Sequence, residues 1–368
     1  MPVKSRLKTI AKAVVPDPVM TPLRSVVKRA KKKRALLGKY RRAWAAPLLH
    51  KRLLAKYRGT RPIRVVFLVS NTASWKVGPV FARMLEDEDF LPIAVICPVV
   101  NGQLSKVADE IAQGVRHYLD TQGFAYVDLT NADENKANEE LDKLDPHLVV
   151  FTNPHRLVPK WLHDDLFRNR LSCYVPYSHE VMHYGDNQEQ HNQDSHNAFW
   201  KIFVPHDVSR QQFAKSRIRG DAGVSVTGFP ACEPLMAPAA ARDPSPWKLQ
   251  DCPKMRVIYA PHWLWRPDIK MATIDTFGDA MMQLADEYRD DIQWALRPHP
   301  MLRPRLMQEP AWGPSRTEAF FAFWESSEFS QIHEDDYIPL FRTSDAMIHD
   351  SGSFLAEYLY LQKPVMYL

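Results

Sequence analysis

From residue 64 to the end, short apolar runs alternate with stretches of helical periodicity, and this alternation restricts the fold more than any other feature of the sequence. In the first part, the predicted strands are residues 64–70, 92–100, 126–129, 147–152, 172–176, 201–204 and 224–227. Three helices are predicted between the first of these strands: one that ends near residue 84, one over residues 105–118 and one over residues 134–144. Strands that alternate with helices of roughly 10–15 residues pair in parallel through right-handed crossovers. The pattern therefore predicts a doubly wound α/β domain.

A second alternation follows residues 237–246, a stretch rich in Pro and Ala that lacks apolar periodicity and is typical of a linker. Its predicted strands are 256–260, 292–297, 346–349 and 364–368, and its predicted helices are 273–288, 316–326 and 354–361. A chain of 368 residues, 45% of them hydrophobic, is long enough to bury two cores. We therefore expect two tandem doubly wound Rossmann-like domains, residues 63–236 and 247–368, preceded by a basic helical N-terminal extension, residues 1–62.

The N-terminal extension is strongly cationic. Residues 1–64 contain 20 Lys and Arg and a single acid, Asp17, whereas acids outnumber Lys and Arg by 14 in the rest of the chain, so the formal net charge is only +5. At helical spacing, the basic and apolar residues predict amphipathic helices that lie on an anionic membrane surface. Breaks are expected at the prolines Pro16, Pro18, Pro22 and Pro47. A solvated arm and nucleic-acid binding are the alternatives that the extension alone leaves open.

No membrane-spanning or secretory segment is expected. The longest uncharged apolar run, residues 90–100, has about half of the roughly 20 residues that a spanning helix needs. The extension also lacks the apolar core of a signal peptide. The four cysteines, Cys97, Cys173, Cys232 and Cys252, are scattered, which favours a reducing cytosol over a disulfide scaffold or a cysteine-based zinc site.

Residues 179–183 read His-Glu-Val-Met-His, which matches the H-E-x-x-H signature of zinc proteases. The context disfavours that chemistry, because the motif follows a predicted strand and residues 184–187 end any helix almost at once. The extended form of the motif also needs a third histidine where Glu189 stands. The acidic run at 334–336 is better explained as a solvated loop than as a metal site. We expect neither a metal nor a cofactor.

Three loops of the second domain carry polar side chains directly after predicted strands. They are Pro261-His262-Trp263, Pro298-His299-Pro300 with Arg297 at the strand end, and Asp350-Ser351-Gly352-Ser353. Ligands of open α/β sheets bind beyond the carboxyl ends of the strands, so these loops are expected to converge on one edge. A Ser-Gly-Ser sequence is also a common helix start, but three such loops at one edge favour a binding site.

An anion suits this edge of the predicted sheet. Ser351-Gly352-Ser353 opens a helix and presents free N–H groups, hydroxyls and the positive end of the helix dipole to a phosphate. Prolines on both sides of His299 fix its imidazole beside the guanidinium of Arg297, and such a pair neutralises a transferring phosphoryl group. Glu357 lies two turns into the helix that Asp350 precedes, where a carboxylate can accept ribose hydroxyls.

The same residues resemble motifs of the bacterial CDP-glycerol glycerophosphotransferase family, the polyol-phosphate transferases of teichoic acids and capsules. The match comprises Tyr259-Ala260-Pro261, Arg297-Pro298-His299-Pro300, the segment from Ser344 to Ser353, Glu357-Tyr358-Leu359 and Lys363-Pro364-Val365. It covers residues 254–368 well, and the first domain only in outline, as at Phe151-Thr152-Asn153-Pro154. The family's T-W-R becomes His262-Trp263-Leu264, its D-Y-S-S becomes Asp350-Ser351-Gly352-Ser353, and its first-domain W-H-G-T-P-L-K motif has no direct match.

The resemblance implies a GT-B fold and transfer of a polyol phosphate, glycerol phosphate or similar, from a CDP-activated donor to a hydroxyl of a lipid-linked or glycan acceptor, with release of CMP. The implied donor-binding residues are Pro261, His262, Arg297, His299, Asp350, Ser351, Gly352, Ser353 and Glu357. His299 would act as a phosphate ligand or acid. His179 would be the base that takes the acceptor proton, because histidine titrates near the working pH.

The resemblance also implies a setting for the reaction. The first domain would hold the acceptor and the second the nucleotide donor, while residues 1–62 would hold a cytoplasmic, peripheral protein on the inner face of the cell membrane, with no nucleic-acid partner. Because the chain stops at Leu368 directly after a predicted strand, the second domain is expected to be truncated at its C-terminus. Two other functions remain open: a GT-B glycosyltransferase that uses a nucleotide sugar, and a non-catalytic GT-B protein that binds a nucleotide or phosphate polymer.

Overall fold

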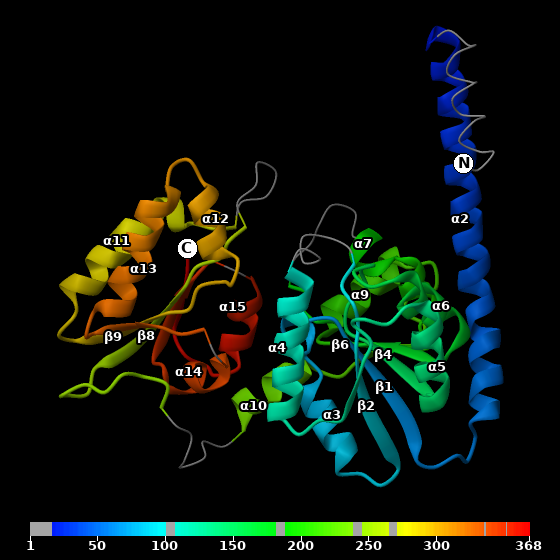
Figure 1. The fold of residues 1–368 in the computed structure, drawn as a ribbon, viewed down its shortest axis with the longest axis horizontal. Helices are drawn as coiled ribbons and strands as arrows, with labels where there is room; N and C mark the ends of the chain where they lie inside the picture. The colour runs from blue at the N-terminus through cyan, green and yellow to red at the C-terminus, as the bar shows by residue number, and fades with distance from the viewer. Residues whose placement is uncertain are drawn as a thin grey trace. The chain divides into compact units, whose positions relative to one another are not determined.

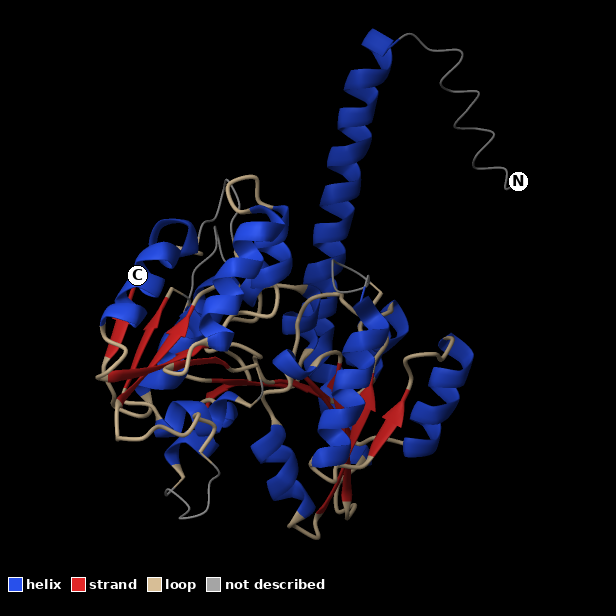
Figure 2. Cartoon of the chain, turned by 60° about the vertical axis from the view of Figure 1, so that its left-hand side comes forward, coloured by secondary structure: helices blue, strands red, loops and turns tan. Residues whose placement is uncertain are grey.

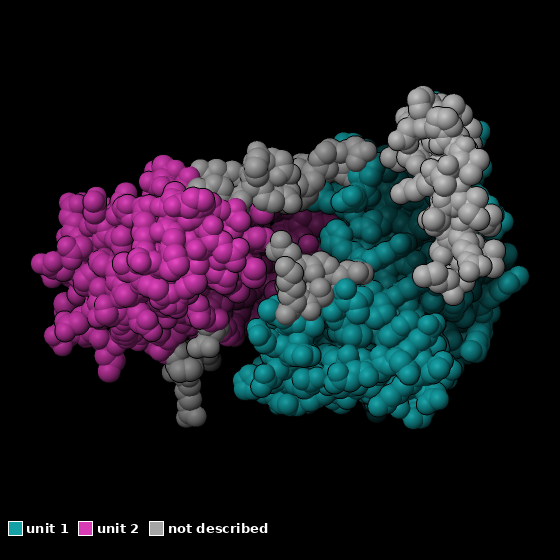
Figure 3. Space-filling view, turned by 45° about the horizontal axis from the view of Figure 1, so that its top comes forward, with its two compact units in different colours: residues 1–72, 88–175, 184–226 teal, residues 73–87, 176–183, 227–368 magenta. Residues whose placement is uncertain are grey.

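The chain forms two parallel β-sheets, each packed between helices (Figures 1 and 2). The computed structural model describes residues 17–100, 107–181, 188–237, 245–264, 271–334, 336–350 and 352–368. The chain divides into two compact units (Figure 3), of which unit 1 comprises residues 1–72, 88–175 and 184–226 and unit 2 comprises residues 73–87, 176–183 and 227–368. The prediction of two Rossmann-like α/β domains is confirmed.

The first sheet lies in unit 1 and has seven parallel strands in the order β3-β2-β1-β4-β5-β6-β7. The strands are β1 (Ile63–Val69), β2 (Phe90–Ile96), β3 (Tyr126–Asp128), β4 (Leu148–Phe151), β5 (Ser172–Tyr174), β6 (Lys201–Val204) and β7 (Val224–Val226). The chain runs outward from β1 to β2 and β3 and then returns to β4 on the other side of β1. The junction of β1 and β4 is therefore the topological switch point of this sheet.

Helices and short helical turns cover this sheet: α4 (Ala108–Thr121), α5 (Glu134–Leu144), η3 (Lys160–Leu162), α6 (Asp164–Asn169), α7 (Gln188–His191), α8 (Asp194–Ala198) and α9 (Asp207–Ser216). Residues 65–69 of β1 are buried without interruption, as expected for a parallel strand that is covered on both faces. In the core, Val66 and Phe151 of the strands belong to one cluster with Leu141 of α5 and Phe213 of α9.

The second sheet lies in unit 2 and has five parallel strands in the order β10-β9-β8-β11-β12. The strands are β8 (Met255–Ala260), β9 (Ile292–Leu296), β10 (Ser330–Ile332), β11 (Ala346–His349) and β12 (Val365–Tyr367). The sequence does not predict β10, because two of its three residues, Ser330 and Gln331, are polar and no apolar run marks it. The predicted strand 92–100 of the first sheet stops at Ile96, since Pro98 has no N–H to donate to a ladder.

Each face of the second sheet has its own core. Val257 and Tyr259 belong to the cluster that includes α11 (Ile274–Glu287), α12 (Leu302–Gln308) and α13 (Gly313–Ser326). Ile258 and Ala260, which alternate with them along β8, belong to the cluster that includes α14 (Tyr337–Thr343) and α15 (Gly352–Leu359). Unit 2 also contains α3 (Gly78–Leu85), η4 (Pro230–Cys232) and α10 (Glu233–Met236), and η1 (Thr72–Ser74) lies at the boundary of the two units. Helices thus cover both faces of the second sheet.

Within the described part of the basic extension, one helix of 40 residues forms, α2 (Asp17–Lys56). The predicted breaks at Pro18, Pro22 and Pro47 are wrong, and Pro16 lies outside the described residues. Pro18 stands in the first turn, where a proline is tolerated because no intrahelical N–H bond is lost there. The helix then continues through Pro22 and Pro47. Within the described parts of the chain, no helix combines the length and the low polarity needed to cross a bilayer.

Packing of α2 against the rest of unit 1 explains how the helix continues past Pro47. Ala43 and Ala46 are buried before the proline, and His50 is 5% exposed after it. The His50 Nε2 lies 2.8 Å from the carbonyl oxygen of Ala198 in α8. These contacts on both sides of the proline offset the roughly 3 kcal/mol that a proline costs in a helix interior.

Candidate functional site

Two of the predicted loops meet at the carboxyl edge of the second sheet. His262 follows β8 and His299 follows β9, and their ring centroids lie 5.0 Å apart in a T-shaped arrangement. The backbone N–H of His299 donates to the carbonyl oxygen of Pro261 at 3.2 Å, which joins the two loops directly. The Trp263 ring lies 5.7 Å from the His299 ring. The structure therefore brings Pro261, His262 and His299 together at the ends of the adjacent strands β8 and β9.

Both imidazoles are held in one tautomer. The Nδ1 of His262 accepts the backbone N–H of Leu264 at 3.1 Å, and the Nδ1 of His299 accepts the backbone N–H of Met301 at 3.1 Å. An Nδ1 that accepts a hydrogen bond carries no proton, so in each neutral ring the proton resides on Nε2. Burial lowers the pKa of His262 to about 4, and burial, His262 and Arg297 together lower the pKa of His299 to about 3. Near neutral pH the pair consists of two uncharged rings that each offer an Nε2–H donor.

Asp350, directly after β11, fixes the position of the His262 loop. Its side chain is fully buried, and its Oδ1 accepts the backbone N–H of His262 at 2.6 Å. Its Oδ2 accepts the backbone N–H of Thr273 at 2.8 Å and the Thr273 hydroxyl at 3.0 Å. Burial raises the pKa of Asp350, and these hydrogen bonds oppose that shift. The sequence does not single out Thr273, which precedes α11 and carries no motif.

Arg297 and the start of α15 complete this edge of the sheet. Arg297 directly follows β9, and its Nη1 donates to the carbonyl oxygen of His333 at 2.7 Å. Its positive charge reaches His299, whose pKa it lowers. Gly352 and Ser353 form the first residues of α15, while Ser351 lies outside the described residues.

Glu357 of α15 takes part in a separate buried network. It is 2% exposed, and its Oε1 lies 3.5 Å from the Nζ of Lys76. The same Nζ donates to the hydroxyl of Tyr337 at 3.3 Å. Burial and the Glu357 carboxylate raise the pKa of Tyr337. The Oε2 of Glu357 is buried and has no hydrogen-bond partner among the described residues, so a hydroxyl donor would suit it. No sequence motif marks Lys76.

His179 contacts the end of α15. Its Nε2 lies 3.1 Å from the hydroxyl of Tyr360, and its ring packs edge-on against Phe229 with centroids 5.1 Å apart. Met182 and His183, the second half of the H-E-x-x-H motif, lie outside the described residues. Across the residues that the structure describes, no group of three or more His, Cys, Asp or Glu side chains is arranged to hold a metal ion.

Comparisons with known proteins agree on the fold. No protein-family model matches the chain, and no curated protein matches it. A solved structure of a variant of the wall teichoic acid polymerase TagF is 15% identical, with a TM-score of 0.52 over 95% of this chain and 79% of that chain. A UDP-GlcNAc 2-epimerase from Neisseria meningitidis, bound to UDP-GlcNAc, is 13% identical, with a TM-score of 0.51 over 83% and 81%. Another UDP-N-acetylglucosamine 2-epimerase is 15% identical, with a TM-score of 0.53 over 84% and 79%. The chain therefore has a GT-B fold of two Rossmann-like domains.

Proposed function

We propose that the chain is a GT-B transferase that moves a polyol phosphate, glycerol phosphate or a similar group, from a CDP-activated donor to a hydroxyl of a lipid-linked or glycan acceptor, with release of CMP. The pair of neutral imidazoles, His262 and His299, is the observation that supports it most. Two Nε2–H donors at the carboxyl edge of a parallel sheet suit a diphosphate, whose oxygens accept hydrogen bonds. The wall teichoic acid polymerase TagF has the same fold.

In the proposed reaction, the acceptor hydroxyl oxygen attacks the phosphorus of the polyol phosphate. The new O–P bond forms as the P–O bond to CMP breaks, and CMP leaves with that electron pair. His262 and His299 hold the phosphate oxygens, the positive charge of Arg297 supports them, and the first residues of α15 receive the pyrophosphate. The unpartnered Oε2 of Glu357 accepts a ribose hydroxyl. His179 is the proposed base for the acceptor proton.

A nucleotide-sugar enzyme is the second candidate, and the likeness to two UDP-GlcNAc 2-epimerases favours it. A phosphate-binding edge and a carboxylate for the ribose would serve a UDP-sugar as well as a CDP-polyol. The two candidates differ in the nucleotide that is released, because a CDP-polyol leaves CMP and a UDP-sugar leaves UDP.

A donor panel tests the proposal. The full chain is incubated with CDP-glycerol, CDP-ribitol and UDP-GlcNAc, each with and without a polyol-phosphate acceptor, and the released nucleotides are separated and quantified. We expect CMP from a CDP-polyol and a loss of about 100-fold or more in His299→Ala, as when one preorganised donor to a transition state is removed. His117→Ala, an exposed histidine of α4 in unit 1, is the matched control. Release of UDP alone would establish the second candidate, and no release from any donor would leave a non-catalytic binding protein.

We also propose that α2 holds the protein on the anionic inner surface of the cell membrane. Leu37, Tyr40, Trp44 and Leu48 are 46–69% exposed and recur every three or four residues, so they share one face of the helix. Ala43, Ala46 and His50 mark the different face, which packs on the rest of unit 1. Exposed basic residues surround the apolar stripe, namely Lys33, Arg34, Arg41, Lys51 and Arg52. Apolar side chains ringed by Lys and Arg suit the boundary between acyl chains and anionic headgroups.

A further inference from the structure

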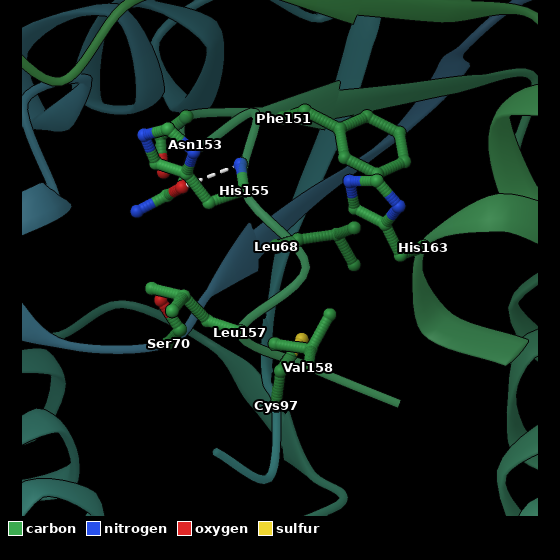
Figure 4. A pocket seen from close by; sticks show the side chains of 10 residues that line it. Leu68, Ser70, Cys97, Phe151, Asn153, His155, Leu157, Val158 and His163 are labelled. Carbon is green, nitrogen blue, oxygen red and sulfur yellow. Dashed lines mark hydrogen bonds between the residues drawn. The ribbon is translucent and has the colours of Figure 1, made fainter. Parts of the chain in front are cut away.

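A pocket opens at the switch point of the first sheet, within unit 1 (Figure 4). Ser70, Cys97 and Thr152 line it, and each is the first residue after a strand, namely β1, β2 and β4. Open α/β sheets bind ligands at this position, because the loops on the two sides of the switch point diverge. None of the residues in the proposed donor site lines this pocket.

The hydroxyls of the pocket have unused hydrogen-bonding capacity. Thr152 is 3% exposed, and its hydroxyl makes no hydrogen bond with any described residue. Ser70 is 8% exposed, and its Oγ accepts a hydrogen bond from the Nδ2 of Asn71 at 3.2 Å, which leaves the Ser70 O–H to donate. A buried hydroxyl with unused hydrogen-bonding capacity is stabilised when water or a ligand forms a hydrogen bond with it.

An amide and an imidazole add two donors. The Oδ1 of Asn153 accepts the backbone N–H of His155 at 2.8 Å, the bond dashed in Figure 4, so the Asn153 NH2 group remains to donate. The Nδ1 of His155 accepts from the Nε2 of Gln193 at 3.3 Å, so the ring proton is on Nε2. Burial lowers the pKa of His155, which favours its neutral form. Of the described residues, no Lys, Arg, Asp or Glu lines the pocket.

Apart from the ring of His163, the rest of the wall is apolar, and the space is small. The Nδ1 of His163 lies 2.8 Å from the Oδ1 of Asp164 and its Nε2 lies 3.3 Å from the carbonyl oxygen of Pro154, so both ring nitrogens already have partners. Leu68, Phe151, Leu157 and Val158 line the pocket, and burial raises the pKa of the Cys97 thiol to about 12, so that side chain is uncharged. The cavity offers about 20 Å³ in which the centre of a water molecule can move. About 10–15 Å³ on this measure holds one water, so the space suits a group of one or two non-hydrogen atoms.

We propose that this pocket receives the terminal hydroxymethyl group of a neutral polyol or sugar. The carbon lies against the apolar wall, and the hydroxyl oxygen exchanges hydrogen bonds with Ser70, Thr152 and Asn153. An anion is disfavoured because no cationic side chain would compensate its lost hydration. The bound molecule is the acceptor of the transfer reaction, and the inference rests on the proposed function for that role alone.

Saturation-transfer NMR on the full chain tests the pocket with ribitol as the probe. We expect transfer to the ribitol hydroxymethyl protons and a roughly tenfold weaker affinity in Ser70→Ala/Thr152→Val, since each lost neutral hydrogen bond costs about a factor of three to ten. Thr121→Val, an exposed threonine of α4, is the matched control and should bind as the unaltered chain does. Inorganic phosphate should not displace ribitol.

Unchanged ribitol binding in Ser70→Ala/Thr152→Val, or displacement of ribitol by inorganic phosphate, would overturn the proposal. Thermal unfolding checks that the variant is folded, and Asn153→Ala, at a half-buried position, supplies the same readout if it is not. His299→Ala separates the pocket assignment from the proposed function, because we expect this variant to lose CMP release and to keep ribitol binding. If the proposed function fails, ribitol still binds and CMP is not released, whereas if the pocket assignment fails, CMP release continues without pocket-dependent ribitol binding.

Discussion

The His299 side chain offers a proton donor at a defined atom, which distinguishes it from a base. Because its Nδ1 is occupied by the Met301 N–H, the Nε2–H is the group that can reach a phosphate. A glutamine amide nitrogen stands close to the position of Nε2, whereas an asparagine amide nitrogen reaches only as far as Nδ1. We expect His299→Gln to keep about a tenth of the CMP-release rate, while His299→Asn and His299→Ala lose about 100-fold or more. Equal rates for the three variants in steady-state assays would contradict the tautomer assignment.

The same pair of histidines makes folding stability depend on pH. In the unfolded chain both rings titrate near pH 6.5, whereas in the folded chain the pKa of His262 is about 4 and that of His299 about 3. Between pH 6.5 and 4 the unfolded state therefore binds protons that the folded state does not, so the free energy of unfolding falls as the pH falls. Urea unfolding at pH 7 and pH 5 should show a smaller difference for His262→Gln/His299→Gln. His117→Gln is the control, and it should keep the full difference.

Asp350 contributes to stability through three hydrogen bonds to two residues. Asp350→Ala leaves the backbone N–H groups of His262 and Thr273 buried without an acceptor, and we expect a loss of about 3 kcal/mol in the free energy of unfolding. Asp345→Ala is the matched control, because Asp345 also accepts a backbone N–H, that of Arg256 at 2.8 Å, but is exposed. We expect Asp345→Ala to lower the free energy of unfolding, measured by denaturant unfolding, by about 1 kcal/mol. Similar losses for both variants would show that the buried position of Asp350 adds nothing.

Helices and strands can be predicted from the sequence where the local pattern of apolar residues is clear. The helix at 134–144 and the strand at 201–204 agree with α5 and β6, because each has a clear pattern and defined ends. The continuity of α2 is not predictable in this way. It depends on packing of Ala43 and His50 against the rest of unit 1. The His50 contact is with Ala198, 148 positions later in the chain, so a rule based on the residues around Pro47 cannot predict it.

The exposed stripe of α2 leads to a membrane-binding prediction. Trp44→Ser/Leu48→Ser removes apolar area from the outward face and leaves the packed face unchanged, so we expect about tenfold weaker binding to phosphatidylglycerol vesicles. Leu249→Ser, at a fully exposed leucine of unit 2, is the control and should bind as before. Cosedimentation measures binding, with phosphatidylcholine vesicles as the uncharged comparison. Equal binding of the double variant and the control would rule out the stripe as the contact.

The division of the molecule into two units does not follow the order of the chain. Residues 73–87 and 176–183 lie in the first half of the sequence and belong to unit 2. The loops after the second-sheet strands could be predicted from motifs, because each motif is local. The ion-pair partner of Glu357 could not be predicted from the sequence, because Lys76 is 281 positions earlier and only the folded chain brings the two residues together.

The Lys76–Glu357 pair tests this composition of unit 2. The Glu357 side chain is 3% exposed and that of Lys76 is 17% exposed, so removing the ammonium alone leaves a buried carboxylate without its counter-ion. We expect Lys76→Met to lower the free energy of unfolding by about 3 kcal/mol and Lys76→Met/Glu357→Gln to recover most of that loss, because a neutral pair carries no desolvated charge. Arg83→Met, which breaks the exposed pair with Glu233, is the matched control and should cost at most about 1 kcal/mol. Additive effects of the two buried changes in a double-mutant cycle would mean that residues 73–87 do not pack on α15 in solution.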